Sequence, residues 1–159
     1  MSERVVAALG ALRARLAELE AVVRETTDRD WERDTAAEHW PVGLVAFHIA
    51  RGFQRQAEFI EAVRDGRGPH RFDWEETHAL NAAVADAHRS PSREEVIRLA
   101  RASVERIAGT LASMDEATLA QPAFAVGGRE RDAVWVAGRL APEHARGHLE
   151  SIAATIAAA

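Results

Sequence analysis

The sequence predicts an all-α protein, a single-domain four-helix bundle with an additional short helix, spanning residues 1–159. Four long segments repeat apolar residues at alternating spacings of three and four, which is typical of one buried helix face. Capping residues, prolines and glycines separate these segments. With 47% hydrophobic residues, a chain of this length buries roughly 70% of its unfolded surface and needs no disulfide.

The first helix is predicted over residues 2–26, with Ser2 as its N-cap. Its apolar seam is made of Val5, Leu9, Leu12, Leu16, Leu19 and Val23. A seam of this kind can pack inside the bundle or against a second subunit, and the spacing alone favours neither. The segment from Thr26 to Glu38 has no sustained apolar period and is interpreted as a connecting loop.

Trp40-Pro41 marks the start of the second helix, predicted over residues 41–65, because proline is well tolerated in a first helical turn. His48 lies on the apolar side of this helix. Arg51 and Arg55 follow it by one and two turns near the same face, and arginines seldom border a dry core.

The additional short helix is predicted from Trp74 to about His88, after the Gly66–Pro69 break and an Asp73 cap. The pattern predicts a further long helix over residues 92–114, opened by a capping box from Ser92 to Glu95. Residues 121–131 are interpreted as a loop, with a small hairpin as the alternative.

The last helix is predicted over residues 132–157, with a kink expected at Pro142, which lacks a backbone donor. His144 and His148 lie four residues apart on its apolar face. Two imidazoles at this spacing can bind one metal ion. The alternative is one hydrogen-bonded core histidine beside one histidine at the rim.

Composition excludes several kinds of chemistry. The chain has no Cys, Tyr or Lys, so cysteine nucleophiles, tyrosine acids and lysine Schiff bases are absent. The net charge of −5, with acids and arginines interspersed, argues against nucleic-acid and membrane partners. With no signal-peptide pattern and no long apolar run, we expect a cytoplasmic protein.

Two sequence blocks together resemble a known family. Trp40 and His48 in WPVGLVAFHIA, followed about 95 residues later by HARGHLESI, are similar to the signature blocks of the DinB/YfiT-like metalloenzyme superfamily. The resemblance implies a DinB-like domain in which His48, His144 and His148 bind one divalent metal ion. Three imidazoles suit Zn²⁺, Ni²⁺ or Fe²⁺. The family resemblance also implies that the protein is a homodimer.

Members of this superfamily resemble thiol-dependent S-transferases and isomerases that use bacillithiol, mycothiol or glutathione. We therefore expect a metal-dependent enzyme that acts on a small-molecule substrate. A low-molecular-weight thiol would be its second cofactor, beside the metal ion. The alternatives are a metal-activated hydrolase that uses bound water and a non-catalytic small-molecule or metal-binding protein. Arg51 and Arg55 are candidates for binding an anionic group of the ligand, the alternative being solvated rim residues.

The other histidines are not predicted ligands. Three of them lie in loops or at segment ends and one lies on a weakly amphipathic helix, so all four are expected at the surface: His39, His70, His78 and His88.

Overall fold

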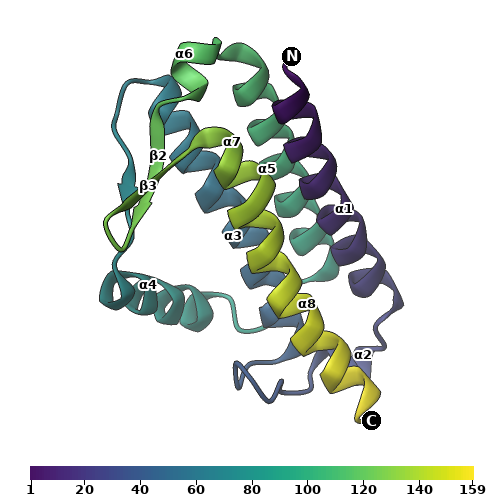
Figure 1. The fold of residues 1–159 in the computed structure, drawn as a ribbon. Helices are drawn as coiled ribbons and strands as arrows, with labels where there is room; N and C mark the ends of the chain where they lie inside the picture. The colour runs from purple at the N-terminus through teal and green to yellow at the C-terminus, as the bar shows by residue number, and fades with distance from the viewer.

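The computed structural model describes all residues 1–159 and confirms the helical bundle. Its long helices are α1 (Glu3–Glu25), α3 (Val42–Arg64), α5 (Arg93–Ser113) and a C-terminal run that ends with α8 (Ala141–Ala157). Figure 1 shows these helices side by side, with the two chain termini at opposite ends of the bundle. No helix is both long enough and apolar enough to cross a membrane.

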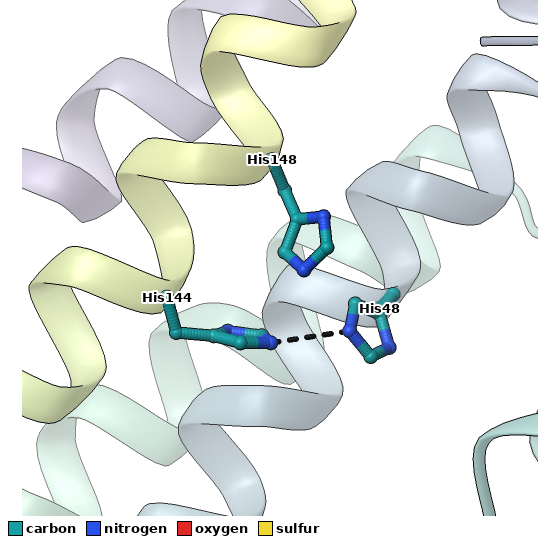
Figure 2. A group of neighbouring side chains, drawn as sticks. All are labelled: His48, His144 and His148. Atoms are coloured by element: carbon teal, nitrogen blue, oxygen red, sulfur yellow. Dashed lines mark hydrogen bonds between the residues drawn. The ribbon is translucent and has the colours of Figure 1, made fainter. Parts of the chain in front are cut away.

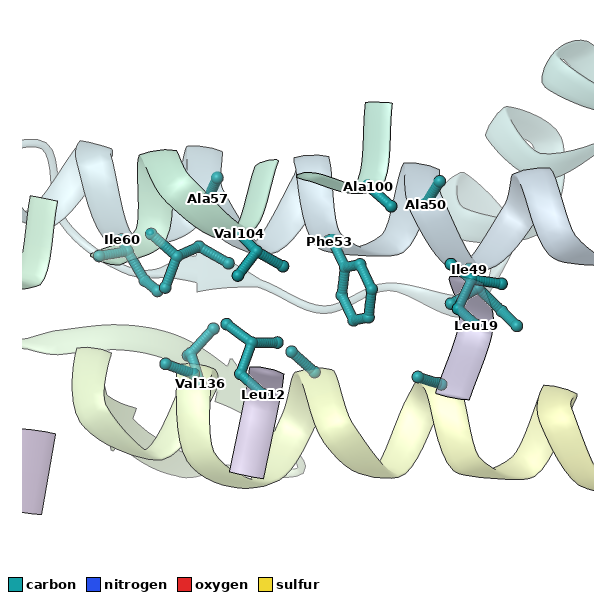
Figure 3. Packing of buried hydrophobic residues seen from close by; sticks show 14 of the residues in the cluster. Leu12, Leu19, Ile49, Ala50, Phe53, Ala57, Ile60, Ala100, Val104 and Val136 are labelled. Atoms are coloured by element: carbon teal, nitrogen blue, oxygen red, sulfur yellow. The ribbon is translucent and has the colours of Figure 1, made fainter. Parts of the chain in front are cut away.

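The core forms where the predicted apolar seams face one another. The seam of α1 packs inside the bundle, since all but one of its six predicted residues are buried: Val5, Leu9, Leu12, Leu19 and Val23. Phe53 reaches from α3 toward the C-terminal helix and is fully buried (Figure 3). The α1 seam is therefore buried inside the bundle and is not available as a dimer interface. The homodimer stays a prediction, and its interface would have to lie on another surface.

The C-terminal run changes geometry just before Pro142. A short helix α7 (Ala133–Trp135) leads into a π-helical turn η1 (Val136–Leu140), in which the Ala141 N–H donates to the Val136 carbonyl five residues back. α8 follows with Pro142 in its first turn, where a missing backbone donor is tolerated. The expected irregularity at Pro142 is thus a π-turn, which adds a residue to the turn preceding the proline.

The segment predicted as a loop from Thr26 to Glu38 contains a short helix α2 (Asp28–Trp31), so that prediction is wrong in part. Thr27 caps this helix by accepting from the Asp30 N–H. The Trp31 side chain is buried and donates to the Pro91 carbonyl at 3.3 Å. Helix α2 is too short to show the apolar periodicity of a helix in the sequence, and the burial of Trp31 holds it in place.

The second interpretation of residues 121–131 is the correct one. Strands β2 (Pro122–Val126) and β3 (Arg129–Asp132) form an antiparallel hairpin after the short helix α6 (Glu116–Leu119). Gly127 and Gly128 make its turn with φ of 55° and 73°, the left-handed conformation that a two-residue hairpin turn requires. A two-residue strand β1 (His70–Arg71) pairs in parallel with β2.

The additional short helix is α4 (Trp74–Ala87), capped by Asp73, whose side chain accepts from the Glu76 N–H. Only Ala85 of this helix is buried. In Figure 1, α4 and the hairpin lie on one side of the bundle, beyond α3. Residues of α4 and of β2 border the same cavity as His48 of α3.

Candidate metal centre

The structure brings the three predicted ligands together. His48 comes from α3, and His144 and His148 come from successive turns of α8 (Figure 2). One nitrogen from each ring can be chosen such that all lie within 4.8 Å of one another. The Nε2 atoms of His48 and His144 are 3.1 Å apart. Helix pairing thus joins residues about a hundred positions apart in the chain.

Two close contacts orient the rings. Trp40 packs edge-on against His48, with ring centroids 5.6 Å apart, which gives the tryptophan of the first block a structural role. His144 lies against Gly52 of α3: a Cβ atom at position 52 would be 2.6 Å from His144 Cε1. Glycine at this position is what lets the His144 ring lie on the backbone of α3.

Burial favours neutral imidazoles. Burial, with a smaller contribution from His148, lowers the pKa of His48 to about 4, although Glu38 acts in the opposite direction. Burial, followed by the charges of His48 and His148, lowers the pKa of His144 well below its ordinary value. A neutral imidazole has a free lone pair, which is the form that binds a metal ion.

Glu38 supports His148 from outside the cluster. Its Oε1 lies 2.7 Å from His148 Nδ1, and its Oε2 accepts a hydrogen bond from Ser151 Oγ at 2.6 Å. Burial alone would raise the pKa of Glu38, but hydrogen bonds from Ser151, Thr35 and His148 lower it overall, so the group is a carboxylate acceptor. His148 Nδ1–H therefore donates to Glu38, which leaves Nε2 free to bind a metal.

Sequence reasoning missed Glu38. This residue was predicted only as the end of a connecting loop, and no role was predicted for Ser151. The loop is held in place by backbone hydrogen bonds from Thr35 N–H to the Trp40 carbonyl and from Val42 N–H to the Arg33 carbonyl, both 2.9 Å. A carboxylate two residues before Trp40 was the available signal, but its partner lies 110 residues away.

The donor set fits a divalent metal ion. A metal bound to imidazole nitrogen at about 2.0–2.1 Å places neighbouring ligand nitrogens roughly 3 Å apart, which the His48–His144 pair matches. Two neutral imidazoles can share only one proton between facing nitrogens, whereas a cation accepts both lone pairs.

A cavity of about 150 Å³ opens beside the cluster and is bordered by His48 and His144. Its walls come from α3, α4, the segment around β1, and Phe124 of β2. Arg51 and Arg55, the candidates for binding an anionic ligand, both border it, and no Asp or Glu does. The arrangement has the features of a small-molecule site: apolar walls with a few convergent polar groups.

The prediction that the remaining histidines lie at the surface is only partly right. His39 and His78 are exposed, but His70 is half-buried, borders the cavity, and stacks on Phe59 with ring centroids 4.2 Å apart. Burial, then the charge of Arg55, lowers the pKa of His70. His88 is also half-buried and stacks on Phe47 at 4.6 Å. Both imidazole rings are half-buried because each stacks on a phenylalanine of α3.

Comparison with known proteins gives one match. The family model described as the DinB superfamily matches residues 11–152, which include all three histidines, Glu38 and the cavity. No curated protein and no solved structure matches the chain.

Proposed function

The chain belongs to the DinB superfamily, and on that premise we propose that it binds one divalent metal ion through His48, His144 and His148. The observation that carries this proposal is the convergence of three rings from two helices at the edge of a cavity. Structural zinc sites normally use four protein ligands. Three protein ligands leave positions open, which suits a site for chemistry.

We further propose that the protein is a metal-dependent enzyme with a low-molecular-weight thiol as co-substrate, an S-transferase or an isomerase. The chain has no cysteine, so a sulfur nucleophile must come from a second molecule. A bound divalent metal would supply Lewis acidity that lowers the pKa of a thiol or water. The cavity beside His48 and His144 gives that molecule access.

The side chains around the cluster hold and orient the reactants. Glu38 fixes the His148 tautomer, and the burial of His48 and His144 keeps them neutral. Arg51 and Arg55 place positive charge on the cavity wall. Low-molecular-weight thiols carry carboxylates or other polar groups, to which a guanidinium forms charge-assisted hydrogen bonds.

Titration of glutathione, bacillithiol and mycothiol into the Co²⁺-loaded protein tests the proposal, because thiolate binding to cobalt produces a charge-transfer absorbance. Arg51→Ala should weaken binding by about 1.5–3 kcal/mol, the usual value of a hydrogen bond to a charged group. Arg13→Ala, on the exposed side of α1, is the matched control. Metal content should be the same in all three proteins.

Equal thiol affinity in the Arg51→Ala variant and the wild type would remove Arg51 from the binding site. Absence of thiol binding to the metal-loaded wild type would refute the thiol-dependent reaction. In that case hydrolysis by activated water, or ligand binding without turnover, becomes the better account of the same metal site.

A further inference from the structure

Gln56 is a buried polar side chain whose amide oxygen has no hydrogen-bond partner in the protein. It lies on α3, two turns beyond His48 and one beyond Gly52, and only 5% of its surface is exposed. Its Oε1 has no hydrogen-bond partner, yet the residue borders the cavity. That oxygen can only accept a hydrogen bond, whereas the Nε2–H₂ group of the same amide can donate to an acceptor bound in the cavity.

Arg55 precedes Gln56 and borders the same cavity. It forms no salt bridge, and its guanidinium lies over the Phe59 ring, 5.4 Å from the centroid. Arg51, in contrast, donates to Gln54. Since no acidic side chain borders the cavity, the positive charge of Arg55 is available to an anionic ligand there.

The end of the cavity beyond Gln56 is aromatic. Phe124 lies 5.8 Å from Phe59 and 5.9 Å from Phe72, measured between ring centroids, and all three rings border the cavity. Leu80 and Val84 of α4 add apolar surface. An apolar cavity of about 150 Å³ is large enough for a benzene ring.

From these three features we propose that the cavity binds an aromatic carboxylate. The ring packs among Phe59, Phe72 and Phe124, while the carboxylate accepts hydrogen bonds from the Arg55 guanidinium and from the Nε2–H₂ group of Gln56. This inference deepens the proposed function by naming the substrate class, and it rests on that function only in taking the cavity as the substrate site.

The test is calorimetric titration with three probes: phenylacetate, its neutral isostere phenylacetamide, and acetate, which lacks the ring. Each is titrated into protein whose metal content has been measured, both metal-loaded and metal-free. Phenylacetate should bind to both forms about ten-fold or more tightly than either other probe, since a charged hydrogen bond and ring burial each contribute at this scale. Equal affinity for phenylacetate and phenylacetamide would overturn the proposal.

Arg55→Gln should abolish the preference for the acid over the amide, whereas Arg71→Gln should retain it, because Arg71 is exposed on β1 and does not border this cavity. Gln56→Leu should weaken phenylacetate binding by about five-fold, because the carboxylate loses the Nε2 donor, while leaving the urea midpoint unchanged or higher, because the variant also removes the unpaired buried Oε1. A preserved acid preference in Arg55→Gln, or a destabilised Gln56→Leu variant with unchanged binding, would contradict these roles.

The metal measurement separates the two proposals. Selective phenylacetate binding by protein that takes up no metal would support the aromatic carboxylate site and refute the metal-dependent function. Stoichiometric metal binding without any preference for phenylacetate would support the metal site and refute the aromatic carboxylate site.

Discussion

The His144 ring lies directly on the backbone of Gly52, with Nδ1 at 2.7 Å and Cε1 at 2.6 Å from where a Cβ atom would stand. A methyl group at this position must displace the ring, and with it one of the three candidate ligands. The contact links the sequence of α3 to the ligand geometry on α8.

Gly52→Ala should therefore weaken metal binding by about ten-fold or more, the scale of loss when a ligand loses its supporting contacts. Alanine is the better helix former, so the metal-free variant should remain folded. Gly109→Ala is the matched control, because nothing lies within 4 Å of a Cβ there. Competition with a chromophoric chelator measures both affinities, and equal values would show that His144 does not need its present position.

Glu38→Ala should weaken metal binding by about 10–100-fold, because His148 loses the acceptor that fixes its tautomer and orientation. Glu38→Gln keeps an acceptor oxygen and should lose less. Glu150→Ala is the control, since this exposed carboxylate on α8 pairs only with Arg146. An affinity for Glu38→Ala equal to that of the control would mean that His148 is oriented by other contacts.

Metal binding at pH 6 should release fewer than two protons per ion from the three imidazoles. His48, with a pKa of about 4, and His144, with a pKa well below its ordinary value, are already neutral at this pH and have no proton to release. Acid weakens binding through His48 only as the pH falls toward 4. Calorimetry in buffers of different ionisation enthalpy counts the protons, and a release of two or more would contradict the neutral state of these two groups.

Phe53→Ala should lower the free energy of unfolding by about 3–5 kcal/mol, since the fully buried ring leaves a cavity between α3 and the C-terminal helix. Val6→Ala, on the exposed side of α1, should change it by less than about 0.5 kcal/mol. Urea unfolding gives both values. A loss for Phe53→Ala no larger than for Val6→Ala would mean that the core is packed differently.

Much of the fold is predictable because its long helices carry their own periodic signals. The seam of α1 and the capping box at Ser92 specify helices whatever their neighbours are. Spacing alone also places His48, His144 and His148 on apolar faces. The DinB resemblance carried by these blocks is confirmed by the family match.

The missed features depend on contacts between distant segments. Strand β1 has two residues and is fixed only by pairing with β2, so the sequence shows no alternating apolar pattern that would predict it. Glu38 lies in a non-periodic loop and acquires its role from α8. The need for glycine at position 52 appears only when His144 is placed against it, and the half-buried state of His70 follows from Phe59 on α3.

The most direct test of the account is the metal content of His148→Ala beside wild type and His78→Ala, each loaded with Zn²⁺ and desalted before elemental analysis. His78 is an exposed histidine on α4, so its removal controls for adventitious binding. We expect one metal ion per chain in the wild type and in His78→Ala, and loss of stoichiometric metal in His148→Ala. Full occupancy in His148→Ala, or no retained metal in the wild type, would contradict the three-histidine site.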